Sequence, residues 1–307
     1  MSELHILDAG RADCTVLLLD TPQGRQTVVV DGGGKYYGAR RPLLEFLTQR
    51  NISDIDLLIL THLHQDHFGG FVHLVDQVQV RRAVAPCRDL QFADRVYPVF
   101  GDQEFYREYH TFFQYLNRSG TELIRSKECA GRTFTFGDFA LDCLYPMRDS
   151  TQRSVTYAEA LCAPELTEEA MAWNLEAHKQ TCNEDSSIWL LRKGGADLAL
   201  LAGDSTDETM RAALCGRTVR PRLQKLSHHG ICARYFSEYV QKIVKPEILV
   251  VSVDKTHYTE DMGAQIDTLC AALWDGPLVG YENTLMVHIR RLREKLEADP
   301  SHPKHLL

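Results

Sequence analysis

The sequence predicts an α/β protein in which two β-rich halves pack face to face. Three observations favour this fold class. Short Val- and Leu-rich runs alternate with segments of helical spacing, a histidine cluster directly follows one such run, and two later segments have the pattern of β-hairpins. The composition, 44% hydrophobic and 25% charged residues, supplies ample apolar mass for a large core. We expect residues 1–307 to form a single domain.

The first part of the chain predicts three strands, a helix and a fourth strand. Apolar runs at 3–10, 14–20 and 27–34 are bounded by Gly, Pro and Asp, as strands of a covered sheet usually are. Residues 40–50 have helical spacing, and the strand expected at 55–62 runs directly into the histidine cluster. Open α/β sheets usually bind ligands at the carboxyl ends of their strands, so the cluster is well placed for chemistry.

The second part of the chain predicts two hairpins and two more strands. The hairpins are expected at 132–146 and 186–204, each with a glycine-containing turn. Strands are expected at 221–230 and 246–253, with a helix over 233–244 between them. These elements form the second β-rich half.

Two segments match no motif. Residues 88–130 are irregular and aromatic-rich, with one helix expected over 105–116, and residues 149–181 are polar and helical. The second segment has the character of an insertion that could cover a site. We expect residues 85–130 and 149–181 to decide which substrate is accepted.

Bulk properties argue for a cytoplasmic protein. The amino terminus has no basic start followed by an apolar segment, and no stretch reaches the ~18–20 apolar residues of a membrane span. Nine scattered cysteines without a C-x-x-C pair indicate reduced thiols. The net charge of −8 argues against a general nucleic-acid surface, although bound metal ions could still attract a phosphate substrate.

The segment THLHQDHFGG, residues 61–70, places four potential metal ligands within six residues. They are His62, His64, Asp66 and His67. Imidazoles and a carboxylate in one tight loop are ligands suited to Zn²⁺ or Mn²⁺. The alternative is a polar loop that happens to be rich in histidine, which is improbable at an average histidine frequency.

The segment resembles the H-x-H-x-D-H signature of the metallo-β-lactamase superfamily, and other motifs of that family appear in the right order. Asp31 lies in VVVDGGG, Asp204 in LLAGD, and His228 and His229 in KLSHHG. With DAGRAD at 8–13 and NEDSSIWL at 183–190, these motifs most resemble the subgroup of ComEC competence proteins and teichoic acid phosphorylcholine esterases. The resemblance implies an αββα sandwich with two divalent metal ions, Zn²⁺ as the expected metal and Mn²⁺ as the alternative.

The resemblance also implies a ligand set. The predicted metal ligands are His62, His64, Asp66, His67, Asp204 and His228. Asp204 would bridge the two ions, and the family pattern favours His228 over His229 as the last ligand. His229 could instead contact substrate, Asp66 could orient the attacking hydroxide, and His257 could act as a general acid or substrate contact. These three are the predicted catalytic residues, with an exposed loop histidine as the alternative for His257.

Some neighbouring residues are candidates for supporting roles. Asp8, Asp13 and Asp31 could accept the second N–H of ligating imidazoles, although Asp31 could also be a simple turn carboxylate. Arg11 stands in a loop where the subgroup has a small amide-bearing sequence, so it could bring a positive charge near the site.

Many superfamily members have a further histidine between the second and bridging motifs, and this chain, like the subgroup, lacks it. His178, Asp185 and His110 are local candidates to replace it, with a surface position as the alternative for each.

The predicted function is dinuclear metal-dependent hydrolysis of a phosphodiester or related phosphate ester by attack of a metal-bound hydroxide. One alternative is a lactone, amide or thioester hydrolase with the same metals. Another is a non-catalytic regulatory or DNA-binding protein that uses the C-terminal tail. The intact ligand set argues against lost catalysis. A small-molecule or phosphodiester substrate is the expected partner, and the oligomeric state is left open.

The tail, residues 281–307, resembles the recognition-helix half of an OmpR-type winged helix. No β-wing follows it, and residues 230–258 fit the hydrolase pattern in place of the first helices of such a domain. We therefore expect a last strand over 284–289 and a charged helix over 290–299, without sequence-specific DNA binding.

Overall fold

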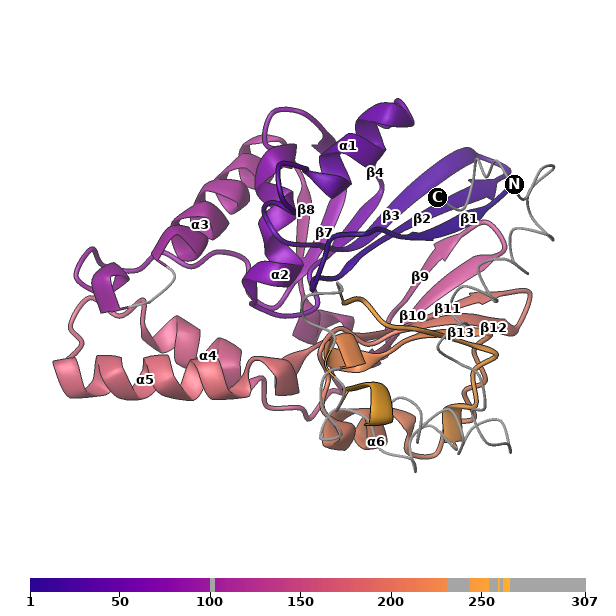
Figure 1. The fold of residues 1–307 in the computed structure, drawn as a ribbon. Coiled ribbons are helices and arrows are strands. Elements are labelled where there is room, and N and C mark those ends of the chain that lie inside the picture. Colours follow the sequence, from indigo (N-terminus) through magenta and orange to yellow (C-terminus); the bar gives the residue numbers. More distant parts are fainter. Residues whose placement is uncertain (100–102, 231–242, 254–258, 260–261, 266–307) are drawn as a thin grey trace.

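Two β-sheets lie face to face at the centre of the molecule, and helices cover both outer faces (Figure 1). The computed structural model describes residues 1–307 except 100–102, 231–242, 254–258, 260–261 and 266–307. The layer order of helix, sheet, sheet and helix is that of the predicted αββα sandwich.

The first sheet is built from the amino-terminal half of the chain, in the order β1-β2-β3-β5-β7-β8. Its first three strands are antiparallel neighbours, and β3, β5, β7 and β8 pair in parallel. The bounds are β1 Glu3–Ile6, β2 Cys14–Thr21, β3 Gly24–Gly32, β5 Leu57–Ile59, β7 Arg82–Ala85 and β8 Glu122–Arg125. A short parallel pair, β4 Asp54–Ile55 and β6 Gln79–Val80, lies outside this sheet.

The second sheet has the order β14-β13-β12-β11-β10-β9. The predicted hairpins are confirmed, because β9 pairs with β10 and β11 with β12 in antiparallel register, whereas β12, β13 and β14 are parallel. The bounds are β9 Thr133–Phe136, β10 Phe139–Tyr145, β11 Ile188–Lys193, β12 Ala196–Leu201, β13 Leu223–Lys225 and β14 Ile248–Val250.

Apolar cores on both sides of the first sheet explain why its strands are apolar on both faces. Along β2, Leu17 and Leu19 point into the core between the sheets, where they join Trp189 of the second sheet. Val16 and Leu18 point the other way, into the core beneath the helices of the first half. Successive side chains of a strand alternate between faces, so a strand with both faces buried needs a continuous apolar run.

The helices are α1 Pro42–Gln49, α2 Gln65–Phe68, α3 Gln103–Arg118, α4 Arg153–Ala160, α5 Glu168–Thr181 and α6 Asp207–Leu214. The first three cover the first sheet and α6 covers the second (Figure 1). The polar segment at 149–181 forms the neighbouring helices α4 and α5, which project from one side of the sandwich (Figure 1). Among the described residues, no helix is both long and apolar enough to cross a membrane.

Some expected elements differ in extent or fall outside the described residues. The strand expected over 221–230 ends at Lys225, because the chain then turns sharply through residues of positive φ. Most of the helix expected over 233–244 and the whole tail at 281–307 lie outside the described residues.

A close backbone contact holds the loop of the histidine cluster against the first sheet. The N–H of Gly70 donates to the carbonyl of Gly33 at 3.0 Å. A Cβ at Gly70 would lie 2.0 Å from the carbonyl oxygen of Gly32, and one at Gly69 would lie 2.3 Å from the amide nitrogen of Lys35. Only glycine fits at both positions, so the G-G pair after the histidines lets the end of α2 lie directly against the first sheet.

Candidate metal centre

The candidate metal ligands meet at one end of the sandwich, between the two sheets. The loop after β5 and the start of α2 carry the first four. Asp204 follows β12, and His229 lies in a short 3₁₀ turn, Ser227–Gly230, after β13. Both sheets therefore contribute side chains from the carboxyl ends of their strands, as the sequence predicts.

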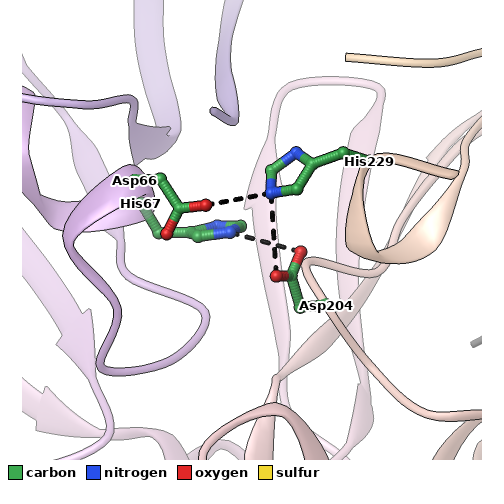
Figure 2. Close-up of side chains that lie close together, drawn as sticks. All are labelled: Asp66, His67, Asp204 and His229. Atoms are coloured by element: carbon green, nitrogen blue, oxygen red, sulfur yellow. Dashed lines mark hydrogen bonds and ion pairs between the residues drawn. The ribbon is translucent and has the colours of Figure 1, made fainter. Parts of the chain in front are cut away.

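One group consists of Asp66, His67, Asp204 and His229 (Figure 2). The Nε2 atom of His67 lies 3.2 Å from Oδ1 of Asp204. The Nε2 atom of His229 lies 3.1 Å from Oδ2 of Asp66 and 3.7 Å from Oδ2 of Asp204. All four potential ligand atoms lie within 4.8 Å of one another, close enough for one cation to bind them together.

A second group consists of His62, His64 and Asp204. The two imidazoles approach with Nε2 of His62 3.0 Å from Nδ1 of His64, and Nε2 of His62 lies 3.7 Å from Oδ2 of Asp204. Asp204 thus belongs to both groups, and its side chain is almost fully buried. The arrangement offers two adjacent cation positions that share one carboxylate.

Two buried carboxylates orient the imidazoles of the first group. Asp31 accepts a hydrogen bond from Nδ1 of His67 at 2.8 Å and is itself held by the amide and hydroxyl of Thr61. Asp13 lies 3.0 Å from Nδ1 of His229. With Nδ1 directed at a carboxylate, each imidazole turns its Nε2 toward the cluster, where the lone pair of that nitrogen would face a bound cation. Asp8, by contrast, is exposed and pairs with Arg40.

The electrostatics of the site call for added positive charge. Burial lowers the pKa of His62 well below its ordinary value, which keeps the ring neutral as a ligand must be. Burial also opposes protonation of His67, yet the carboxylates of Asp204, Asp31 and Asp66 raise its pKa well above the ordinary value. The negative charge of the surrounding carboxylates thus favours a proton on the buried ring of His67. A bound divalent cation would neutralise the same negative charge.

Unsatisfied atoms point to the same conclusion. Among the described residues, Nε2 of His67 and Oδ1 of Asp204 are buried without a hydrogen-bond partner, although they face each other as an ion pair. Buried polar atoms are normally satisfied, and exceptions need an explanation. Imidazole and carboxylate donors converging in this way fit ions of the Zn²⁺ or Mn²⁺ class.

The two adjacent histidines after β13 point in different directions. Both have positive φ, 49° for His228 and 55° for His229, so the chain turns sharply between them. The ring of His229 is fully buried in the first group, whereas the side chain of His228 is 20% exposed with Nε2 3.8 Å from Asp204. The structure thus places His229, and not His228, among the clustered ligand atoms, which reverses the positions expected from the motif.

The other candidates from the sequence lie outside the two groups. His178 is buried in α5, where its ring nitrogens contact the hydroxyl of Tyr106 at 2.7 Å and the carbonyl of Ser154 at 2.9 Å. Asp185 accepts hydrogen bonds from the amide and hydroxyl of the same Ser154. His110 pairs with Asp89 on the surface side of α3. These three residues therefore have structural contacts outside the two ligand groups. His257 lies outside the described residues.

Arg11 is exposed, in the loop between β1 and β2 that leads to Asp13. Burial chiefly lowers the pKa of His228 to about 4, and the charge of Arg11 contributes in the same direction. The expected positive charge near the centre is therefore present, next to the more exposed histidine of the pair.

Sequence reasoning missed Lys225. Its side chain is almost fully buried at the end of β13, and its ammonium group donates to Asp13. A lysine inside a predicted strand, three residues before the histidine pair, is the signal that could have found it. Such a charge is rarely buried without a specific partner.

Comparison with known proteins agrees with this geometry. Residues 9–104 match the family model of the Metallo-beta-lactamase superfamily, and residues 264–307 match that of the Transcriptional regulatory protein, C terminal. ComE operon protein 3 of Bacillus subtilis (strain 168) is 32% identical over 98 residues, 27% of this chain and 12% of that protein. The Transcriptional regulatory protein YvrH of the same organism is 49% identical over 41 residues, 13% of this chain and 17% of that protein. The chain thus matches only a small part of either relative.

Two solved structures illustrate the range of structural similarity. Igni18, a metallo hydrolase from the archaeon Ignicoccus hospitalis KIN4/I, has a TM-score of 0.46 at 13% identity, covering 88% of this chain and 91% of its own. Zn²⁺-bound PqqB from Methylobacterium extorquens has a TM-score of 0.42 at 9% identity, covering 84% and 83%. Residues 9–104, which include the histidine cluster, thus match the metallo-β-lactamase superfamily, and the layered fold agrees with that match.

Proposed function

We propose that this chain is a dinuclear metal-dependent hydrolase that cleaves a phosphodiester or related phosphate ester. The observation that carries the proposal is the sharing of Asp204 by two groups of potential ligands. His62, His64 and Asp204 would hold one ion. Asp66, His67, Asp204 and His229 would hold the other, so that His229 takes the role first given to His228.

Bound divalent cations would supply an activated water molecule and neutralise the charge of a phosphate ester. The side chains around the site would orient the reacting water and bind the substrate. The side chain of Asp66 is 37% exposed and faces both the cluster and solvent, so it is suited to orient the attacking hydroxide. His228 and Arg11 stand at the rim, where they would contact the anionic oxygens of the substrate. The positive charge of Arg11 favours a phosphate ester over a neutral lactone, amide or thioester, and the neutral ring of His228 could still donate a hydrogen bond.

We expect purified protein loaded with Zn²⁺ or Mn²⁺ to bind close to two ions per chain and to hydrolyse a chromogenic phosphodiester. Elemental analysis gives the stoichiometry. A substrate panel with a phosphomonoester, a lactone and a thioester then gives the class. A firm single ion, or none, would overturn the dinuclear site. Faster turnover of the lactone or thioester than of any phosphate ester would favour the alternative hydrolase.

A cytoplasmic location belongs to the same proposal. The cysteines within the described residues are all free thiols, and five of the seven are also fully buried. Free thiols suit a reducing compartment. Secretion of the native protein into an oxidising compartment would contradict this expectation.

A second candidate function, DNA binding, rests on the match of residues 264–307 to a transcriptional regulator family. We expect no sequence-specific duplex binding. Within residues 290–299, four basic side chains are offset by three acidic ones, which leaves little net charge for phosphate contacts.

A duplex-binding titration at physiological salt with a random-sequence pool tests this expectation. It compares the full chain with a variant that ends before Arg290. The expected result is weak, salt-sensitive association at most in both. Enrichment of one sequence by the full chain, lost on truncation, would establish the regulator function instead.

A further inference from the structure

A buried lysine and a buried aspartate join the two halves of the protein next to the metal centre. The ammonium group of Lys225, at the end of β13 in the second sheet, donates to Oδ2 of Asp13, just before β2 in the first sheet. The two side chains are 4% and 6% exposed. Burying such a pair is costly unless the geometry and the remaining hydrogen bonds are good, so its presence beside the site needs an explanation.

The second oxygen of Asp13 faces the candidate ligand His229. Oδ1 lies 3.0 Å from Nδ1 of His229 and also accepts a hydrogen bond from the hydroxyl of Ser252. Both oxygens of Asp13 are therefore engaged, one by Lys225 and one by His229 and Ser252. This arrangement leaves the carboxylate no freedom to rotate away from the imidazole.

The orientation of His229 follows from this contact. Because Nδ1 is directed at Asp13, Nε2 points at Asp66 and Asp204, at 3.1 Å and 3.7 Å, and with the proton on Nδ1 its lone pair would face a bound cation. The same ring rotated about its Cβ–Cγ bond, or in the other tautomer, would present no lone pair to the cluster. Partners of this kind usually fix both the tautomer and the ring orientation of a metal-binding histidine.

We propose that Lys225 is a positioning residue for one of the two metal ions. It holds Asp13, and Asp13 holds His229 with Nε2 directed at the group of Asp66, His67, Asp204 and His229. This inference rests on the proposed metal-dependent function and extends it to a residue that contacts no ligand atom of the ions. It also predicts selectivity, because among the described contacts Lys225 and Asp13 touch nothing in the pair His62 and His64.

The test compares the metal affinities of Lys225→Met and Lys225→Arg with that of the unchanged chain. Each protein is freed of metal with a chelator and titrated with Zn²⁺ against a chromogenic competitor. Co²⁺ absorption spectra separately report the ligand geometry. We expect Lys225→Met to keep one tight ion per chain and to bind the second ion about 10- to 100-fold more weakly. Lys225→Arg keeps a positively charged side chain next to Asp13. This variant should therefore retain most of the affinity for the second ion.

Asp13→Asn supplies a second variant in case the methionine variant does not fold. It should weaken the same ion, and the double variant should be no worse than the more severe single one, because both act through one chain of contacts. Lys193→Met is the matched control, since Lys193 is an exposed lysine at the far end of β11 and should leave both affinities unchanged.

Three results would overturn the inference. Equal weakening of both ions, or a lower unfolding temperature of the metal-free variant with unchanged affinities, would make the pair a purely structural link between the halves. Failure of Lys225→Arg to recover any affinity would exclude positioning through Asp13. If the unchanged chain itself binds no metal, the proposed function is wrong. If every variant binds two ions as tightly as the unchanged chain, the proposed function stands and only the role of Lys225 is wrong.

Discussion

Replacing Asp204 with alanine is expected to remove both metal ions and to abolish hydrolysis. Its oxygens lie 3.2 Å from Nε2 of His67 and 3.7 Å from Nε2 of His62, so it serves both ligand groups. Its loss would also leave two adjacent cations without the negative charge that offsets their repulsion. Several kcal/mol of stabilisation would disappear, which corresponds to a fall in kcat/KM of roughly 10³-fold or more.

Elemental analysis and turnover of a chromogenic phosphodiester measure this effect. The matched control is Asp197→Ala, because Asp197 lies near the start of β12, the strand that Asp204 follows, and outside both groups. That variant should retain two ions and its activity. An Asp204→Ala protein that still carried two ions would show that Asp204 is not the shared ligand.

The second large effect separates the two adjacent histidines. His229→Ala is expected to lose the ion of its group and keep the other, because the ring is fully buried with Nε2 aimed at Asp66 and Asp204. His228→Ala is expected to keep both ions and to raise KM for an anionic substrate several-fold, because its partly exposed ring stands at the rim near Arg11.

Metal content and the separate values of kcat and KM distinguish the two variants. Loss of an ion from His228→Ala with retention in His229→Ala would restore the assignment that the motif alone favours. Equal losses in the two variants would mean that both rings bind metal.

The fold and most of the site were predictable because their determinants are local in sequence. The apolar run of β2 already indicates a strand buried on both faces, with Val16 and Leu17 on opposite sides. His62 and His67 lie in one loop after a strand, so their convergence needs no knowledge of distant contacts. Asp204 is recognisable because it follows an apolar strand closely, in a Gly-Asp pair.

What could not be predicted depends on contacts between distant residues or on one backbone turn. Lys225 and Asp13 are 212 residues apart, and the sequence around either residue does not indicate that the two are in contact. The inward direction of His229 follows from the positive φ values of two successive histidines, which residue identity does not encode. His178, a candidate ligand by composition, instead contacts the hydroxyl of Tyr106, a residue 72 positions away in the sequence.

The contribution of ligands from both sheets has a consequence for the lifetime of the protein. The loop before α2 belongs to the first half, whereas Asp204 and His229 belong to the second, so a fully formed site exists only while the halves are docked. An ion that binds the docked form alone adds RT ln(1 + [L]/Kd) to the free energy of unfolding, about 4 kcal/mol when it is present at ~1,000 times its Kd. Metal supply would then govern not only turnover but also how much of the chain survives proteolysis in the cell.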